Sequence, residues 1–373
     1  MNIIEYISLK IPRIAYMEYL KVKRKSKAFN KKQTDKALII NCSNPEIYHR
    51  YFYGLIKFFS IEGYTIYFPT FNFKYFKHNV HTKYKSPWNQ HQLIYQEGLI
   101  CLEEAPNKSK NSIELNENNL NPDYFTCYFK TDIIKTNSYH IPISMHPKFY
   151  NNNYWDKEVS YLSKRKRSIF MVGNFGSAFY SGYSATPFNS DGRIEVFQHL
   201  NKEKILREFN TRIEFDDFLK SNDDDNVCII LDSNKIRIDI SELREVLNNF
   251  YFYLALPGSV MPFSHNIIEA LSVGSILIIH EEYAKMMSPE LKHLKNAIIY
   301  NDLEDLTNKI NLAYNLNEKE LFYLRDKAKE YYNLHLTPKA VVNKIVTGNY
   351  DMMYLLAEHL SVDILEKNLK NEG

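Results

Sequence analysis

The hydrophobic positions in the second half of the chain form short continuous runs that alternate with longer amphipathic stretches. Continuous apolar runs of about four to eight residues are typical of strands buried on both faces, and amphipathic stretches of about ten or more are typical of helices. The pattern predicts strands at 168–172, 227–231, 251–256, 275–280 and 297–300, with helices at 192–209, 241–249, 264–273 and 303–314. This alternation predicts a doubly wound, Rossmann-like α/β domain with a parallel sheet.

The first half contains one clear unit of the same kind. A strand at 37–41, a helix at 46–61 and a strand at 64–68 form a βαβ unit, which implies a second parallel sheet. Weaker signals predict short strands at 99–103, 112–115 and 124–129, and the end of the chain predicts helices that include 318–334 and 350–369.

These elements predict two Rossmann-like domains that face a cleft, with the C-terminal helices crossing back to the N-terminal domain. The expected division is a basic amphipathic segment at 1–36, an N-terminal domain at 37–160, a C-terminal domain at 161–345 and a C-terminal helix at 346–373. A stretch rich in Asn, Lys and Arg at 150–167 predicts the connection between the domains.

Composition and charge narrow the class of protein. The chain has 373 residues, of which 45% are hydrophobic and 24% charged, as is typical of a globular protein of about two domains. The formal net charge of +3 is too close to balance for nucleic acid to be the expected partner. Residues 10–36, however, carry ten Lys or Arg against Glu18 and Asp35 alone. This segment is either a solvated N-terminus or a surface that contacts an anionic membrane.

Cysteine usage and hydropathy indicate the compartment. The four cysteines are scattered without a CxxC pair, which is typical of free thiols under reducing conditions. The sequence has neither an apolar run of membrane-spanning length nor a signal-peptide pattern. The expected location is the cytoplasm, with peripheral contact at the inner membrane face as the open alternative for the basic segment.

The stretch 253–279 contains the most informative motif. A buried strand ends at Pro257-Gly258, and a loop then leads to Ser264, which we expect to be the N-cap of a helix. The first turn of a helix attracts a diphosphate because its backbone N–H groups and dipole are positive there. Glu269 stands in this helix, where a carboxylate could accept both hydroxyls of a ribose. The motif therefore predicts a nucleotide site.

The ordered residues Pro257-Gly258, Ser264, Glu269-Ala270 and Gly274-Ser275-Ile276 resemble the donor-site motif of GT-B glycosyltransferases, and the exostosin-like group is the most similar. The resemblance covers 227–314 and extends weakly back to 165. It implies a nucleotide-sugar donor in the C-terminal domain, bound by Ser264 and Glu269, and no cofactor.

The sequence departs in two respects from the families that the motif resembles. His265 and Asn266 follow Ser264, where many exostosin-like proteins have an arginine. Met261 stands eight positions before Glu269, where retaining GT-B enzymes have a second glutamate. The second departure favours an inverting reaction.

A second candidate loop, 171–177, directly follows the first strand of the C-terminal domain. Gly173 and Asn174 would let the backbone approach a phosphate closely, and Arg193 could neutralise it. An ordinary strand-to-loop turn and a surface salt bridge of Arg193 are the alternatives.

An inverting transfer needs a general base that deprotonates the acceptor hydroxyl. His49, in the loop after the first strand, and Glu97 are the candidates that we select in the N-terminal domain. A cap or a solvated carboxylate is the alternative for each, and Glu103, Glu104 and Asp123 are further candidates.

No metal site is expected. The twelve histidines include no HExxH pair, and the Asp223-Asp-Asp225 run precedes an apolar strand, whereas the metal-binding DxD of GT-A enzymes follows one.

Together these features predict a glycosyltransferase that moves a sugar from a nucleotide-diphosphate sugar to a glycan or lipid-linked glycan hydroxyl in surface polysaccharide synthesis. Three alternatives stay open: another transferase or an epimerase on the same fold, a non-catalytic protein that binds a nucleotide or a glycan and acts as an assembly partner, and a nucleic-acid protein, which the charge disfavours.

Overall fold

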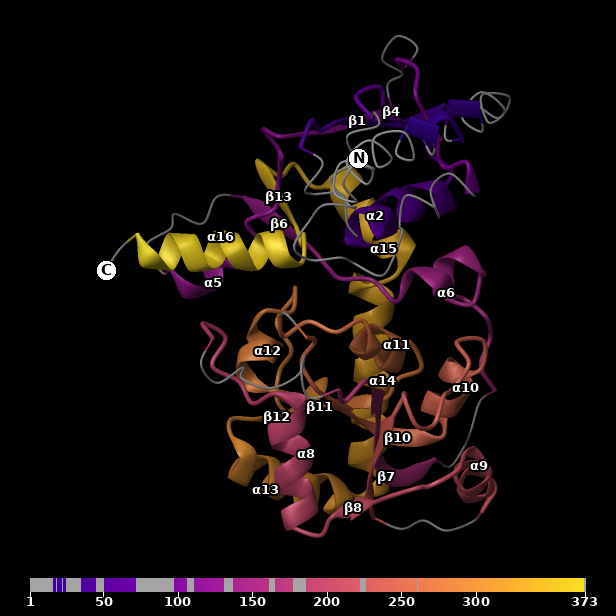
Figure 1. Ribbon diagram of the computed structural model, residues 1–373, viewed down its shortest axis with the longest axis vertical. Coiled ribbons are helices and arrows are strands. Elements are labelled where there is room, and N and C mark those ends of the chain that lie inside the picture. The colour runs from indigo at the N-terminus through magenta and orange to yellow at the C-terminus, as the bar shows by residue number, and fades with distance from the viewer. Residues whose placement is uncertain are drawn as a thin grey trace, which may run out of the picture. The chain divides into compact units, whose positions relative to one another are not determined.

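The chain forms two compact units in the computed structural model (Figure 1). Unit 1 comprises residues 1–151 and 338–373, and unit 2 comprises residues 152–337. The structure describes residues 16–24 without 18 and 22, 35–44, 50–71, 97–105, 111–130, 137–160, 165–176, 186–221, 226–259 and 261–371.

Unit 1 contains a four-stranded parallel sheet in the order β3-β2-β1-β4. Its strands are β1 (Lys36–Asn41), β2 (Thr65–Tyr67), β3 (Ile100–Cys101) and β4 (Asn111–Asn116). Helix α2 (Arg50–Ile61) follows β1 and packs on β2 through its apolar side chains. The predicted βαβ unit is therefore present, because β1, α2 and β2 follow one another in the chain and β1 pairs in parallel with β2.

A second, three-stranded parallel sheet completes unit 1 in the order β5-β13-β6. β13 (Met352–Leu355) lies between β5 (Leu120–Asn121) and β6 (Ser138–Ile141). The accompanying helices are α5 (Thr126–Phe129), α6 (Pro147–Asn151), α15 (Pro338–Thr347) and α16 (His359–Lys370).

Two predicted elements of unit 1 are wrong. The expected strand at 124–129 is helix α5, which follows Asp123, whose Oδ1 accepts from the backbone N–H of Thr126 at 3.3 Å. The single helix expected at 350–369 begins only at His359, because residues 352–355 pair with β5 and β6 instead.

Unit 2 contains a six-stranded parallel sheet in the order β12-β11-β10-β7-β9-β8. Its strands are β7 (Lys166–Gly173), β8 (Leu206–Arg207), β9 (Cys228–Asp232), β10 (Phe250–Ala255), β11 (Ile276–His280) and β12 (Ala297–Tyr300). β10 and β11 are buried along their whole length, in agreement with their continuous apolar sequences. Both units thus confirm the predicted class, α/β with parallel, Rossmann-like sheets.

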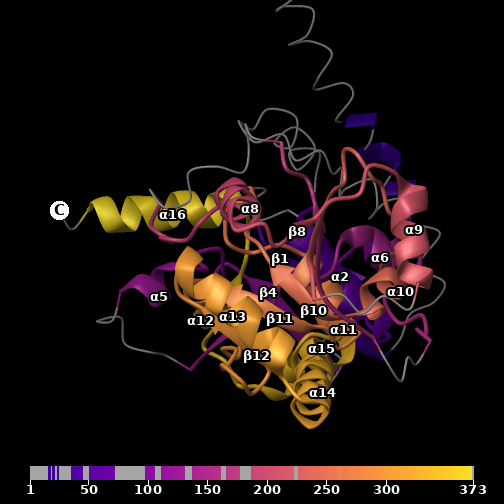
Figure 2. The same cartoon turned by 90° about the horizontal axis from the view of Figure 1, so that it is seen from below.

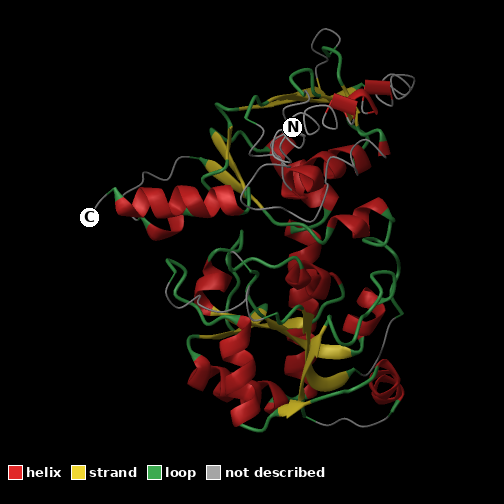
Figure 3. Cartoon of the chain, in the orientation of Figure 1, coloured by secondary structure: helices red, strands yellow, loops and turns green. Residues whose placement is uncertain are grey.

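Helices pack on the strands of this sheet or, in the case of α8, on the neighbouring helix α13 (Figures 2 and 3). They are α8 (Arg193–Lys202), α9 (Arg212–Lys220), α10 (Leu243–Asn248), α11 (Asn266–Ser272), α12 (Glu281–Lys285), α13 (Leu303–Asn315) and α14 (Glu318–His335). The helix predicted at 192–209 is shorter, because the chain turns at Glu203 and Lys204 and then enters the edge strand β8.

The boundaries of the two units differ from the predicted domain boundaries, which lie between residues 160 and 161 and between residues 345 and 346. Unit 2 begins at Asn152, and unit 1 resumes at Pro338. α15 belongs to unit 1 because it packs on α2, a contact that links residues far apart in the sequence.

The basic N-terminal segment lies largely outside the described residues. Its described part, within 16–24, is helical. In the described part of the chain, no helix combines the length and the apolar character needed to cross a membrane.

Candidate functional site

The strand order of unit 2 reverses between β7 and β10. From β7 the chain moves to β8 and β9 on one side, and it then returns to build β10, β11 and β12 on the other side. In open α/β sheets such a reversal leaves a crevice outside the carboxyl ends of the two central strands, and ligands bind there. The loops that follow β7 and β10 contain the candidate donor-site residues predicted from the sequence. Gly173-Asn174 belong to the first, and Pro257 to His265 belong to the second.

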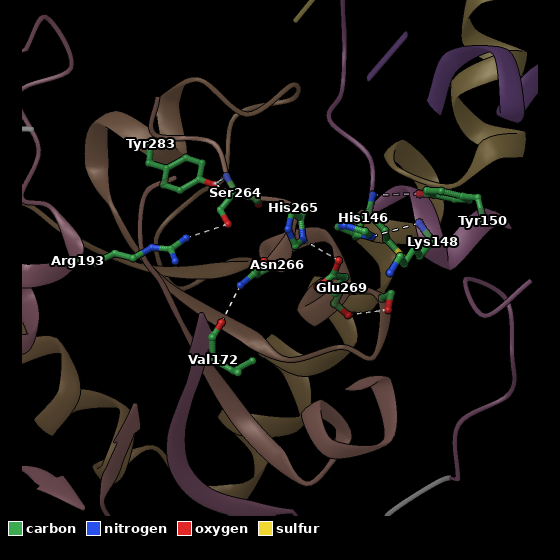
Figure 4. A network of polar contacts seen from close by, with 12 residues as sticks. His146, Lys148, Tyr150, Val172, Arg193, Ser264, His265, Asn266, Glu269 and Tyr283 are labelled. Atoms are coloured by element: carbon green, nitrogen blue, oxygen red, sulfur yellow. Dashed lines mark hydrogen bonds and ion pairs between the residues drawn. The ribbon is translucent and has the colours of Figure 1, made fainter. Parts of the chain in front are cut away.

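Arg193 joins these two loops. It is the first residue of α8 and only 4% exposed. Its Nε donates to the carbonyl of Pro257 at 2.7 Å, and its Nη1 donates to the carbonyl of Asn174 at 3.0 Å. Its Nη2 donates to Oγ of Ser264 at 3.4 Å (Figure 4). The alternative of a surface salt bridge is therefore wrong, and a buried cation lies where both loops meet.

Gly173 and Gly258 make this packing possible. A Cβ on Gly173 would lie 2.7 Å from Nη1 of Arg193, so a larger residue would displace the guanidinium. A Cβ on Gly258 would lie 2.7 Å from the carbonyl oxygen of Phe263 and 3.0 Å from that of Met261. The loop after β10 is closed on itself, since the N–H of Gly258 donates to the carbonyl of Pro262 at 3.3 Å.

We expect Gly258→Ala to destabilise unit 2 by about 1–3 kcal/mol, because the new methyl group meets backbone oxygens that cannot rotate away. Urea denaturation measures the change. Gly63→Ala in unit 1 is an instructive comparison: its cost should come from a φ of 81° alone, since a Cβ there meets no atom within 4 Å. A Gly258→Ala chain as stable as the wild type would contradict the tight loop.

Ser264 is not the N-cap that the sequence predicted. Helix α11 begins at Asn266, and His265 occupies the N-cap position without a side-chain capping bond. The backbone N–H of Ser264 instead donates to the hydroxyl of Tyr283 on α12 at 2.5 Å, and its Oγ faces Arg193 (Figure 4). Ser264 is thus held from both sides at the crevice.

Asn266 and Tyr283 also belong to the site, although neither was predicted from the sequence as a site residue. Nδ2 of Asn266 donates to the carbonyl of Val172 at 2.7 Å, which fixes the start of α11 to the end of β7. Neither role could be predicted from a local pattern, because the partners of Asn266 and Tyr283 lie 94 and 19 positions away in the sequence.

Glu269 is almost completely buried, with 1% of its surface exposed. Its Oε1 lies 2.9 Å from Nδ1 of His265, whose side chain is 27% exposed. The predicted contact of Glu269 with a ribose stays a prediction, and in this structure His265 is the more accessible member of the pair.

Three cations hold the carboxyl end of α11. Nη2 of Arg165 donates to the carbonyl of Val273 at 2.7 Å, Nε of Arg244 donates to Oγ of Ser272 at 3.1 Å, and Nζ of Lys329 donates to the carbonyl of Ser272. Cations are favourable at this negative end of a helix. Burial, with Arg244 and Arg165 nearby, lowers the pKa of Lys329 to about 8. The position of α11 is therefore fixed at both of its ends.

The two selected base candidates of unit 1 have different outcomes. His49 lies outside the described residues. Glu97 precedes β3 and thus lies at the amino-end edge of the sheet, whereas ligands of such sheets bind at the carboxyl-end edge. Its carboxylate accepts from the hydroxyl of Tyr53 at 2.5 Å and forms an ion pair with Lys57. These contacts favour a structural role for Glu97.

The carboxyl-end edge of unit 1 carries other carboxylates. Glu117, after β4, accepts from the backbone N–H of Ser43 and from its hydroxyl at 2.9 Å, and these bonds lower the pKa of Glu117. Glu103 and Glu104 follow β3 at the same edge. Within the described residues, no group of three or more His, Cys, Asp or Glu side chains could hold a metal ion.

No protein family and no curated protein matches the sequence. Solved structures with a similar fold include an alpha-glucosyltransferase in complex with UDP and a mismatched 13-mer DNA, at 12% identity over 84% of this chain and 99% of that one, with a TM-score of 0.41. HepE of Anabaena in complex with UDP matches at 10% identity over 83% and 98%, with a TM-score of 0.33. WaaG, a glycosyltransferase involved in lipopolysaccharide biosynthesis, matches at 9% identity over 84% and 100%, with a TM-score of 0.31.

Proposed function

We propose that this chain is a glycosyltransferase of the GT-B type that binds a nucleotide-diphosphate sugar in unit 2. One observation carries the proposal: the loops after β7 and β10 meet at the point where the strand order reverses, around the buried cation Arg193. Gly173, Asn174, Pro257, Gly258, Ser264 and His265 would form the donor site there. The crevice expected at this edge of a parallel sheet, with the buried guanidinium of Arg193 beside it, suits a diphosphate.

The proposed reaction transfers the sugar to a hydroxyl of a glycan or lipid-linked glycan acceptor, in the synthesis of a surface polysaccharide. The bond from the acceptor oxygen to the anomeric carbon forms as the bond from that carbon to the diphosphate breaks. Ser264 and its surroundings would stabilise the departing diphosphate without a metal, and a base in unit 1 would take the hydroxyl proton. Met261, in the place of a second glutamate, supports inversion.

A thermal-shift screen against UDP, GDP, CMP, ADP and dTDP tests the proposal. A nucleotide at about 100 times its dissociation constant adds about 2.7 kcal/mol to the stability of the protein that binds it, and it raises the melting temperature. We expect one nucleoside diphosphate to stabilise the wild type, and Gly173→Val to abolish this by displacing Arg193. A folded chain that none of the five nucleotides stabilises would refute the donor site.

The basic N-terminal segment supports a cytoplasmic enzyme that contacts the inner membrane face, where a lipid-linked acceptor would lie. Tyr16 and Met17 are 51% and 52% exposed, and Lys21, Lys23 and Arg24 nearby are also exposed. Apolar and cationic side chains together suit an anionic membrane surface. We expect binding to vesicles with anionic lipid, and no binding to vesicles of neutral lipid alone.

A non-catalytic nucleotide- or glycan-binding protein is the second candidate. The observation that favours it is Glu97, a selected base that is held by Lys57 and Tyr53 at the amino-end edge of its sheet. Release of UDP from a UDP-sugar, with or without acceptor, distinguishes the two candidates, since a binding protein releases none.

A further inference from the structure

A thiol and an imidazole lie together in unit 1, and the proposed function uses neither of them. Cys127 belongs to α5, and His140 belongs to β6, an outer strand of the three-stranded sheet (Figure 1). Sγ of Cys127 lies 3.2 Å from Nε2 of His140, which is hydrogen-bond distance for a sulfur atom. A cysteine within hydrogen-bond reach of a base is the arrangement in which proteins activate this side chain as a nucleophile.

The imidazole is oriented to accept the proton of the thiol. Burial lowers the pKa of His140 to about 4, so the ring is neutral at pH 7 and one of its nitrogens carries a lone pair. A hydrogen bond to the backbone of Tyr124 acts in the opposite direction and raises this pKa, so the ring is the donor in that bond. Because Nε2 faces Cys127, the donor to Tyr124 is Nδ1. The S–H group of Cys127 therefore donates to the lone pair of Nε2.

Aromatic rings around His140 favour the charge that forms when this proton moves. Tyr354 stacks on the imidazole with ring centroids 4.5 Å apart, and the rings of Tyr124 and Tyr128 lie edge to face with it at 5.0 and 5.1 Å. A cation within about 6 Å of the centre of an aromatic ring is attracted to its face. A thiolate in contact with the imidazole also favours the protonated ring. The pair can therefore exist as thiolate and imidazolium while an electrophile reacts.

The other three cysteines of the chain are in a different environment. Cys42, Cys101 and Cys228 are buried, and burial raises their pKa to about 12, 11 and 12, respectively. Thiols with such a pKa are almost entirely protonated at pH 7, and the thiolate is the reactive form. Cys127 is partly exposed. It is thus the one cysteine of the four that combines access to solvent with a contact to a base.

We propose that Cys127 is a nucleophilic thiol activated by His140, and that it forms mixed disulfides with low-molecular-weight disulfides. Nε2 of His140 takes the proton of Cys127, and Sγ attacks one sulfur of the disulfide. The new S–S bond forms as the S–S bond of the reagent breaks, and the departing thiolate takes the proton from the imidazolium. Cys127 is thereby oxidised, half of the reagent becomes bound, and the other half leaves as a thiol.

Limited reaction of the full chain with dithiodipyridine, followed by peptide mass spectrometry, measures the rate at each cysteine. We expect Cys127 to react at least about tenfold faster at pH 7 than each of the three buried cysteines, because these are both less accessible and more fully protonated. A wild-type chain in which Cys127 reacts no faster than the buried cysteines overturns the inference.

His140→Phe tests the role of the base, because it keeps an aromatic ring in the stack and removes the nitrogen that takes the proton. We expect Cys127 to react about tenfold more slowly in this variant at pH 7, the effect of one pKa unit on the fraction of thiolate. The difference should vanish near pH 9, where an ordinary thiol ionises without a base. Equal rates of the wild type and His140→Phe at pH 7 overturn the inference.

The pH profile separates the role of the base from a change in packing. A variant that only altered the exposure of Cys127 would change the rate by the same factor at every pH. Four further titratable side chains near the pair belong to types that ordinarily keep their charge between about pH 6 and pH 9, namely Asp123, Tyr124, Tyr128 and Tyr354. A constant ratio of the two rates across this range also overturns the inference.

Tyr139→Phe is the matched control. Tyr139 precedes His140 on β6, so its side chain points to the other face of the sheet, and its ring stacks on Tyr350. We expect this change to leave the rate at Cys127 unaltered, and equal slowing in Tyr139→Phe and His140→Phe overturns the role of the base. If His140→Phe does not fold, as a melting curve would reveal, His140→Gln replaces it, since an amide cannot take the proton. A wild-type rate in His140→Gln at pH 7 overturns the inference.

Discussion

Arg193→Met is expected to destabilise unit 2 by about 2–4 kcal/mol and to abolish nucleotide binding. Methionine fills similar space but donates no hydrogen bond. The carbonyl of Pro257, which is buried, and the carbonyl of Asn174 would each lose a donor, and a buried acceptor without a partner costs about 1–3 kcal/mol. Because the guanidinium also joins the loops after β7 and β10, the crevice should lose its shape as well as its charge.

Urea denaturation of unit 2 and the nucleotide screen measure the two effects. Arg212→Met is the control, because Arg212 lies in the same unit and pairs with Asp216 and Glu242, each at 2.7 Å, while its side chain is 32% exposed. Partly exposed pairs of this kind contribute about 0–1 kcal/mol each. Equal losses of stability in the two variants would contradict the structural role of Arg193.

Unit 1 is expected to lose up to about 3 kcal/mol of stability as the pH falls from 6.5 to 4, through His140 alone. Burial lowers the pKa of His140 from 6.5 to about 4. The unfolded chain therefore binds more protons than the folded one between these values, so stability rises with pH in this window and is lost on acidification. His140 stacks on Tyr354 of β13 with ring centroids 4.5 Å apart, so the same group reports on the attachment of the C-terminal strand.

The difference in unfolding free energy between the wild type and His140→Phe separates the contribution of His140 from that of the other titratable groups. This difference should change by about 3 kcal/mol between pH 6.5 and pH 4. Cys127→Ala is the control. It removes the thiol whose Sγ lies 3.2 Å from Nε2 of His140 but keeps the imidazole, so the pH dependence should persist. A His140→Phe chain with the same pH dependence as the wild type would show that the ring is not buried in its neutral form.

Five of the six strands of unit 2 could be predicted from the sequence because most of their side chains are buried on both faces, whereas the short, half-buried edge strand β8 could not. The runs at 251–256 and 275–280 became β10 and β11 within one residue at each end, and no contact distant in the sequence was needed to recognise them. The motif that spans Pro257 to Glu269 likewise lies in one continuous stretch, so its local order was visible in the sequence.

The errors arose where distant parts of the chain decide the structure. Residues 352–355 have a helical neighbourhood in sequence, but they pair with strands more than 200 positions earlier. Arg193 could not be recognised as buried, since its acceptors lie 64, 19 and 71 positions away. Ser264 resembled an N-cap, yet its backbone N–H bonds Tyr283, and the helix begins two residues later.

Hydrogen–deuterium exchange, with and without the nucleoside diphosphate that the screen selects, tests the central claim most directly. The account predicts slower exchange on binding for the backbone amides of 173–176 and of the loop from Gly258 to His265. Protection confined to other segments, with no change in these two loops, would contradict a donor site at the carboxyl ends of β7 and β10.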